Sequence, residues 1–215
     1  MHLKRQKVPK NWPIFRKGTK YVVRPNSDTQ KGIPLLIVLR DMLKLAQNKK
    51  EAKRIIHLRE VLVNNKPVSD EKKNVMLFDT ISLFAIKKYY RMELSNHGKF
   101  YLTEIKDNEV NHKIVKLADK KILKGKKVQL NFEDGRNFIS DVKCSVNDSL
   151  IVNFKEKKVE KCIPLKDGSG VFVFSGKHSG KSGVVKEIHK EKRIAEIDID
   201  GKPISVLIKQ FMVVK

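Results

Sequence analysis

The hydrophobic pattern of this chain changes its period near residue 61, and this change strongly constrains the fold. Between residues 34 and 57, apolar side chains recur at spacings of three and four, which is typical of amphipathic helices. After residue 61, short runs rich in Val, Ile, Leu and Phe follow one another and are separated by turn signals. The sequence therefore predicts an α+β fold in which two helices precede small antiparallel β domains.

The segment before the change carries the two predicted helices. Pro34 suits the first position of one helix, whose apolar face comprises Leu35, Val38, Leu39, Met42, Leu45 and Ala46. Asn48 is placed to cap the second, and Glu51 completes the spacing of a capping box. The apolar face of the second helix comprises Ala52, Ile55 and Ile56. Its opposite face carries a basic stripe with few acids nearby in the sequence, formed by Lys50, Lys53, Arg54 and His57.

Beyond the helices, VLV and KPV flank an Asn64-Asn65 turn and predict a tight hairpin. Further strands are predicted at VMLFDTISLFAI, YYRMEL, KFYLTEI, KKVQLNF, NFISDV, DSLIVNF, VFVFSG, SGVVKEI, RIAEIDI and ISVLIKQ. We expect boundaries near residues 33, 105 and 170. The resulting parts are an N-terminal arm (1–33), a two-helix-plus-hairpin module with its following strands (34–105), a central antiparallel β domain (106–170) and a C-terminal barrel (171–215).

The charge balance indicates the kind of partner. Lys and Arg total 47 against 24 Asp and Glu, a formal charge of +23, which implies nucleic acid or an acidic membrane surface. Hydrophobic residues make up 40% of the chain, enough for a core, whereas aromatics at 7% argue against binding mainly by base stacking. A membrane surface is disfavoured because no predicted helix combines a basic face with exposed Trp or Phe.

The first 33 residues carry nine basic side chains and one acid, Asp28. Pro and Gly prevent a long helix there, and Trp12, Phe15 and Tyr21 are interleaved among the charges. One interpretation is a flexible tail. The composition favours an arm that lies against phosphates, uses its rings for packing or stacking, and becomes ordered on the nucleic acid.

Other classes of site find little support in the sequence. Cys144 and Cys162 have no second pair with which to build a zinc site and are expected to be buried thiols in a reducing compartment. The start of the chain has no signal-peptide core, and no apolar run is long enough to span a membrane. The glycine-rich loop at 176–183 lacks the order of a nucleotide-binding loop. We therefore expect a soluble intracellular protein without metal, cofactor or small-molecule substrate.

Two segments resemble known RNA-binding motifs. LRDMLKLAQNKKEAKRIIHLREVLVNNKPVSDEKKNVMLFDTISL resembles the S4-type RNA-binding module, in which two helices and a hairpin form one RNA-facing surface. FVFSGKHSGKSGVVKEI resembles the KOW motif of SH3-like barrels, which implies that Lys177, His178 and Lys181 project from its loop. Asn65, Met76 and Ser175 stand where glycines are usual in these patterns.

Taken in order along the chain, HLKR, RKG, IPLLIVLRDML, the module, DGRN and the KOW-like loop resemble the archaeal and eukaryotic small-subunit ribosomal protein S4e family. The resemblance implies a non-enzymatic constituent of the small ribosomal subunit, in the cytoplasm, with ribosomal RNA and neighbouring subunit proteins as partners. The predicted RNA contacts are Lys4, Arg5, Lys7, Lys10, Trp12, Arg16, Lys17, Lys20 and Arg24 in the arm, Arg40, Lys44, Lys49, Lys50, Lys53, Arg54 and His57 on the helices, Asn64, Asn65 and Lys66 at the hairpin, and Lys177, His178 and Lys181 near the C-terminus.

Two alternatives stay open at the level of sequence. An RNA-modifying enzyme needs a catalytic domain, and the scattered histidines and turn acids provide no recognisable site. A free RNA-binding factor, such as a chaperone or an accessory protein of transcription or translation, would cycle on and off RNA. In each case the binding is expected to be largely electrostatic, and removing Lys50, Lys53 and Arg54 is expected to flatten its salt dependence by up to about three units.

Overall fold

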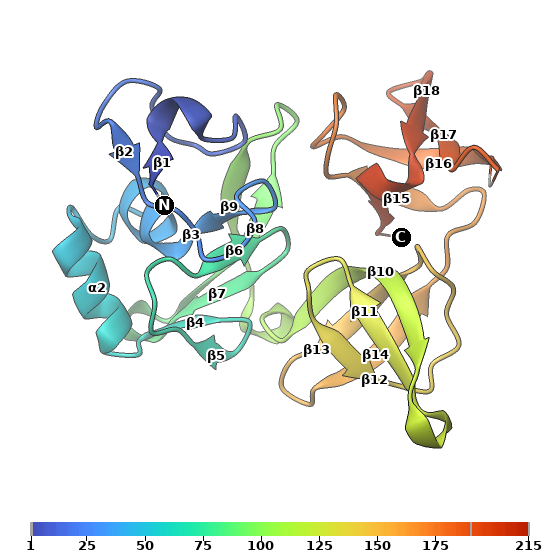
Figure 1. Ribbon diagram of the computed structural model, residues 1–215, viewed down its shortest axis with the longest axis horizontal. Coiled ribbons are helices and arrows are strands. Elements are labelled where there is room, and N and C mark those ends of the chain that lie inside the picture. Colours follow the sequence, from blue (N-terminus) through green and yellow to red (C-terminus); the bar gives the residue numbers. More distant parts are fainter. Residues whose placement is uncertain (1, 190, 215) are drawn as a thin grey trace. The chain divides into compact units, whose positions relative to one another are not determined.

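The computed structural model describes residues 2–189 and 191–214 and is mostly β-structure with few helices (Figure 1). It divides into two compact units. The first runs from the N-terminus to Ser95 and includes Lys99–Asn111, and the second comprises Asn96–Gly98 and the chain from His112 onward. The arm belongs to the first unit. The division into four domains expected from the sequence remains a prediction.

Two short strand pairs fold the arm and its continuation within the first unit. β1 (Leu3–Lys4) pairs antiparallel with β2 (Tyr21–Val22), and β3 (Gly32–Pro34) pairs antiparallel with β6 (Asn74–Met76). The Trp12 ring is only 2% exposed. The arm is therefore folded, in contrast to the expectation that it becomes ordered only on a nucleic acid.

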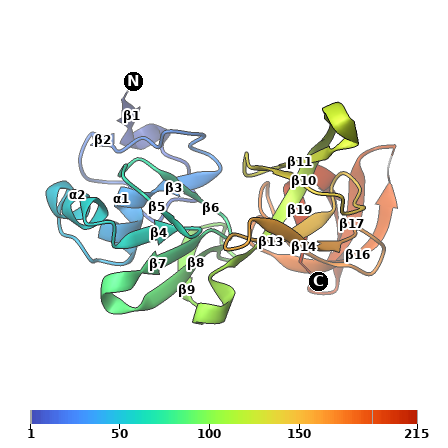
Figure 2. The same cartoon turned by 90° about the horizontal axis from the view of Figure 1, so that it is seen from below.

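The first predicted helix is shorter than expected. α1 (Leu35–Ile37; Figure 2) continues as a π-helical segment (Val38–Met42). At the end of this segment, the Leu43 N–H donates to the Val38 carbonyl at 2.9 Å. Lys44 then adopts a left-handed conformation with φ of 56°, which ends the helix. As a result Leu45, predicted on the apolar face, is 38% exposed, whereas Ala46 is buried.

The second predicted helix is confirmed as α2 (Lys49–His57). The Asn48 side chain accepts a hydrogen bond from the Glu51 N–H at 3.0 Å, and the Glu51 carboxylate accepts one from the Gln47 N–H at 2.7 Å. The first bond satisfies an N–H of the first turn that has no partner within the helix, and the second ties the residue before the cap to the same turn. Ala52 and Ile56 are fully buried, as the apolar face predicts.

A five-stranded antiparallel sheet completes the first unit, in the order β5-β4-β7-β8-β9. Its strands are β4 (Val61–Val63), β5 (Lys66–Pro67), β7 (Thr80–Leu83), β8 (Lys88–Leu94) and β9 (Phe100–Glu104). The predicted hairpin is confirmed, because Asn64 and Asn65 have φ of 52° and 59° between β4 and β5. Positive φ at both central residues is typical of a type I′ turn.

The second unit contains two five-stranded antiparallel sheets, each with its own apolar core. The first has the order β12-β11-β10-β13-β14 and comprises β10 (His112–Ile122), β11 (Val128–Phe132), β12 (Asn137–Ile139), β13 (Ser149–Asn153) and β14 (Lys158–Ile163). The second has the order β18-β17-β16-β15-β19 and comprises β15 (Gly170–Val173), β16 (Ser182–His189), β17 (Ile194–Ile199), β18 (Lys202–Leu207) and β19 (Phe211–Val213). β10, β14 and β19 were absent from the predicted strands.

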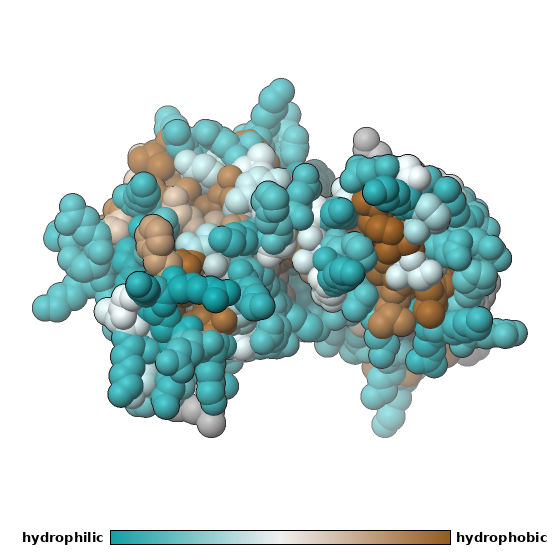
Figure 3. All heavy atoms as spheres, turned by 90° about the horizontal axis from the view of Figure 1, so that it is seen from above, coloured by the Kyte–Doolittle hydropathy of each residue, from teal (hydrophilic) through white to brown (hydrophobic). Residues whose placement is uncertain are grey.

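The surface is largely hydrophilic on the face drawn in Figure 3, where apolar side chains form separate patches. Among the described residues, no helix is long and apolar enough to cross a bilayer.

Candidate nucleic-acid interface

The basic stripe of α2 is divided by an acid from another segment. Lys49 and Lys53 form ion pairs with Glu71 at 2.9 and 3.4 Å between their ammonium nitrogens and its two carboxylate oxygens. Lys50 and Arg54 lie on the neighbouring edge of the helix and form no ion pair within the described part of the chain. The interpretation that the stripe has few acids nearby is therefore wrong for Lys53, and Lys49, a predicted contact beside the stripe, is paired with the same acid. The exposed and unmatched edge is the better candidate for phosphate contact.

Glu71 is held as an anion by the two lysines that it pairs with. Burial raises the pKa of this carboxyl group, but hydrogen bonds and positive charge from Lys49 and Lys53 outweigh that effect, so its pKa lies below the ordinary value. The side chain is 9% exposed, and the backbone carbonyl of Glu71 accepts from the Leu36 N–H at 3.0 Å. This carboxylate therefore fixes one side of α2 to the loop before β6.

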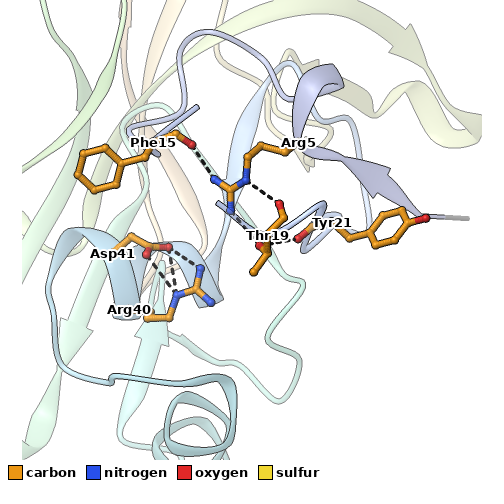
Figure 4. Close-up of polar contacts among 6 residues, drawn as sticks. All are labelled: Arg5, Phe15, Thr19, Tyr21, Arg40 and Asp41. Atoms are coloured by element: carbon orange, nitrogen blue, oxygen red, sulfur yellow. Dashed lines mark hydrogen bonds and ion pairs between the residues drawn. The ribbon is translucent and has the colours of Figure 1, made fainter. Parts of the chain in front are cut away.

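Arg5 closes a loop of the arm (Figure 4). Its guanidinium donates to the carbonyl oxygens of Phe15 at 2.6 Å and Thr19 at 2.7 Å, and to the Thr19 hydroxyl at 2.9 Å. These bonds engage three of its nitrogens, and the Trp12 ring is buried. We therefore assign both residues to folding of the arm and leave them out of the proposed contacts.

The other arm cations predicted as contacts are all exposed: Lys4, Lys7, Lys10, Arg16, Lys17, Lys20 and Arg24. Strand β1 presents Lys4, a 3₁₀ turn at Arg5–Lys7 presents Lys7, and loops present the others. The folded arm thus keeps the charge that the sequence assigned to it, on a surface whose shape is set by Trp12 and Arg5.

The hairpin turn exposes fewer of the predicted contact residues than expected. Asn64 is 1% exposed, donates to an Asp79 carboxylate oxygen at 2.7 Å and accepts from the Thr80 N–H at 3.0 Å. Half-buried Asn65 donates to the Asn111 side chain. Both asparagines thus shape the turn, and Lys66 is its exposed cation.

In the second unit, the loop before β16 holds the predicted C-terminal contacts. Lys177 is exposed, while His178 and Lys181 are half-buried. Gly176 has φ of 90°, and a Cβ there would lie 2.9 Å from the Gln210 amide nitrogen. Only glycine fits this backbone without strain.

The two cysteines are free thiols in the same unit, with Cys144 buried and Cys162 half-buried. Burial, together with the neighbouring Asp148 charge, raises the pKa of Cys162 to about 11. A thiol with such a pKa is protonated and unreactive at neutral pH.

An open cavity of about 590 Å³ lies in the first unit. It is lined by His2, Leu3, Tyr21, Val22, Val23, Arg24, Pro25, Asn26, Leu36, Arg40, Lys49 and Lys72. Arg24, Arg40 and Lys49 were predicted contacts, and the fold brings them together from the arm, the π-helical segment and α2. Sequence reasoning missed Lys72, because it follows Asp70 and Glu71 and so lies in a stretch that looks neutral.

The protein is folded and basic, with exposed cations that have no acidic partner and a cavity lined by cations. These features are typical of the class of proteins that bind structured polyanions.

Comparison with known proteins identifies the family. The model described as ribosomal family S4e matches residues 86–159, and that of the RS4NT domain matches residues 1–27. The chain is 42% identical over 190 residues to the small ribosomal subunit protein eS4 of Methanocella arvoryzae, covering 87% of this chain and 80% of that protein. It is 34% identical over 193 residues to the eS4 protein of Nanoarchaeum equitans, covering 88% and 82%.

A solved structure agrees with these relatives. The crystal structure of the 30S ribosomal protein S4e from Thermoplasma acidophilum is similar with a TM-score of 0.74 at 26% identity, covering 86% of this chain and 95% of that one. The chain therefore belongs to the ribosomal S4e family.

Proposed function

We propose that this chain is a structural constituent of the small ribosomal subunit, where it binds and stabilises folded ribosomal RNA beside neighbouring subunit proteins. The observation that carries the proposal is its likeness, over 87% of its length, to a small ribosomal subunit protein. Membership of a ribosomal family supports a structural role and not an enzymatic one.

The proposed contacts follow from exposure and charge. In the first unit they are the exposed arm cations, the Lys50, Arg54 and His57 edge of α2, and Lys66 at the hairpin. α2 and the β4–β5 hairpin would act as an S4-type module. In the second unit the glycine-bearing loop with Lys177, His178 and Lys181 would act as a KOW-type contact.

The binding is driven mainly by counterion release. Each phosphate that a lysine or arginine neutralises lowers the slope of log affinity against log salt by roughly 0.7 to 0.9. Ordered cationic surfaces of this kind read the backbone of folded RNA by its shape, and they carry little base specificity.

Sedimentation of a cell lysate through a sucrose gradient tests the proposal. At low and moderate salt we expect the full chain to migrate with the small subunit, because many distributed phosphate contacts resist partial screening. Migration at the top of the gradient in both salts would exclude the ribosomal role and leave a free RNA-binding factor. Migration with a different particle would assign another partner.

A further inference from the structure

We propose that the cavity in the first unit receives one unpaired nucleotide of the bound RNA, with its phosphate on the cationic lining and its base on the apolar lining. This inference rests on the proposed function and goes beyond it, because it makes one extruded nucleotide a specific feature of the RNA. The cavity volume of about 590 Å³ falls within the range of about 300–1,000 Å³ usual for sites of small ligands.

The cationic lining carries more positive charge than its acids neutralise. Arg40 forms an ion pair with Asp41 at 2.8 Å, and Lys49 forms one with Glu71 at 2.9 Å. Arg24 and Lys72 also line the cavity and form no ion pair within residues 2–189 and 191–214. The charge of Lys72 interacts with the nearby Asp70 carboxylate and is therefore balanced in part. Arg24 leaves an unmatched positive charge beside the cavity, which a phosphate group complements.

The ion pairs also hold the two matched cations in place. The Arg40 guanidinium makes hydrogen bonds of 2.8 to 3.3 Å with both carboxylate oxygens of Asp41 (Figure 4). Since Lys49 is fixed by Glu71, two of the four cations are ordered before a ligand arrives. A pre-ordered site loses less side-chain entropy on binding.

The rest of the lining suits a base or sugar. Val22, Val23, Pro25 and Leu36 provide apolar surface. Val23 packs on the core cluster that contains Leu36, so this part of the wall is backed by packed side chains. Tyr21, 49% exposed, and His2 also line the cavity, with ring centroids 5.4 Å apart. Unpaired bases are commonly bound by such aromatic and apolar groups.

The combination favours an unpaired nucleotide over a stretch of duplex. In an A-form helix the bases are stacked inside, so a duplex offers a cavity only its phosphates and sugars. An extruded nucleotide can fill both the apolar and the cationic lining, and extrusion costs least where the base is already unpaired.

Binding of three labelled RNA hairpins to the full chain tests the inference. One hairpin is fully paired, the second carries a single bulged nucleotide, and the third carries an abasic residue at the bulge. We expect the bulged hairpin to bind about tenfold more tightly than either of the others, an effect of the size of one base–aromatic contact.

Two double variants locate the effect. Arg24→Gln with Lys72→Gln changes the cavity, and Lys50→Gln with Arg54→Gln removes the same charge from a surface that does not line it. All four side chains are exposed, so both variants are expected to fold, which circular dichroism and the fluorescence of buried Trp12 can verify. We expect the cavity variant to lose most of its preference for the bulge, whereas the control variant weakens binding to all three hairpins equally.

Each failure has a distinct meaning. If the wild-type chain binds all three hairpins with equal affinity, the nucleotide site is excluded while RNA binding stands. If it binds none of them, and also fails to sediment with the small subunit, the proposed function fails as well. If the cavity variant keeps the preference, or the control variant loses it, the nucleotide is bound elsewhere and the assignment to this cavity is wrong.

Discussion

Helix α2 of the first unit and strand β10 of the second are both rich in lysine, yet they use it in different ways. On α2, Lys50 is exposed and forms no ion pair with the described residues. On β10, Lys113 and Lys116 are each only 3% exposed. Helix α2 exposes its charge to solvent, and strand β10 places charge inside the fold.

The buried lysines have identifiable partners. The Lys116 ammonium group donates to the carbonyl oxygens of Ile208 and Phe211, the latter at 2.8 Å, and lies 5.6 Å from the centroid of the Phe211 ring. The Lys113 ammonium group pairs with Asp134 at 3.0 Å. A formal charge of +23 therefore overstates what is available to RNA, since part of it holds the second unit together.

The largest expected effect is on stability. Lys116→Ala removes a buried side chain and leaves two backbone carbonyls without their donor, so it is expected to lower the free energy of unfolding by about 3 kcal/mol. Lys50→Ala, on the exposed edge of α2, is expected to change it by about 0.5 kcal/mol or less. Denaturant unfolding followed by circular dichroism measures both. If both variants lost the same small amount of free energy of unfolding, burial of Lys116 would contribute little to stability, and the contrast between the two units would not hold.

The pH dependence of stability sharpens the same contrast. Burial lowers the pKa of Lys116 from 10.5 to about 8, against the opposing charge of Glu133. Between these values the unfolded chain binds more protons than the folded one, so the free energy of unfolding rises with pH. From about pH 7 to about pH 9.5, we expect this residue to contribute a gain of about 2 kcal/mol.

Lys116→Met is the matched control, because it keeps an apolar stem of similar length but cannot titrate. The gain is the rise in the wild-type chain minus the rise in this variant, which cancels the titration of other groups. Parallel pH profiles for the two proteins would contradict the depressed pKa.

Local rules predicted the parts of the fold that depend on neighbouring residues. The cap at Asn48 and Glu51 and the turn at Asn64 and Asn65 are fixed by side-chain bonds and φ preferences within a few positions, so the sequence identified α2 and the hairpin correctly. The same reasoning placed Lys50 and Arg54 opposite the buried Ala52, and both side chains are exposed.

Tertiary contacts decided what local patterns could not predict. Strand β10 was missed because inward-facing lysines interrupt the apolar alternation of HKIVKLADKKI. These lysines can be buried only because other segments of the fold supply their hydrogen-bond and ion-pair partners. The pairing of Glu71 with Lys49 and Lys53 depends on how the loop before β6 packs on α2. The Trp12 ring is adjacent to charged segments in sequence, but in the fold it lies in the core.

The two edges of α2 give the smallest and most specific test. Lys50→Ala with Arg54→Ala is expected to flatten the salt slope of RNA binding by about 1.5 units, at roughly 0.7 to 0.9 per lost phosphate contact. Lys49→Ala with Lys53→Ala removes the same formal charge, but those charges are already matched by Glu71. The second pair of substitutions is therefore expected to flatten the slope by less than half as much. It is also expected to destabilise the fold, because it leaves the Glu71 carboxylate, which has low exposure, without its two partners.

Affinity measured across a salt series, with unfolding measured in parallel, separates the two effects. Equal slopes for the two variants would mean that RNA displaces Glu71 from its lysines, so that all of α2 faces phosphate as the sequence alone predicted.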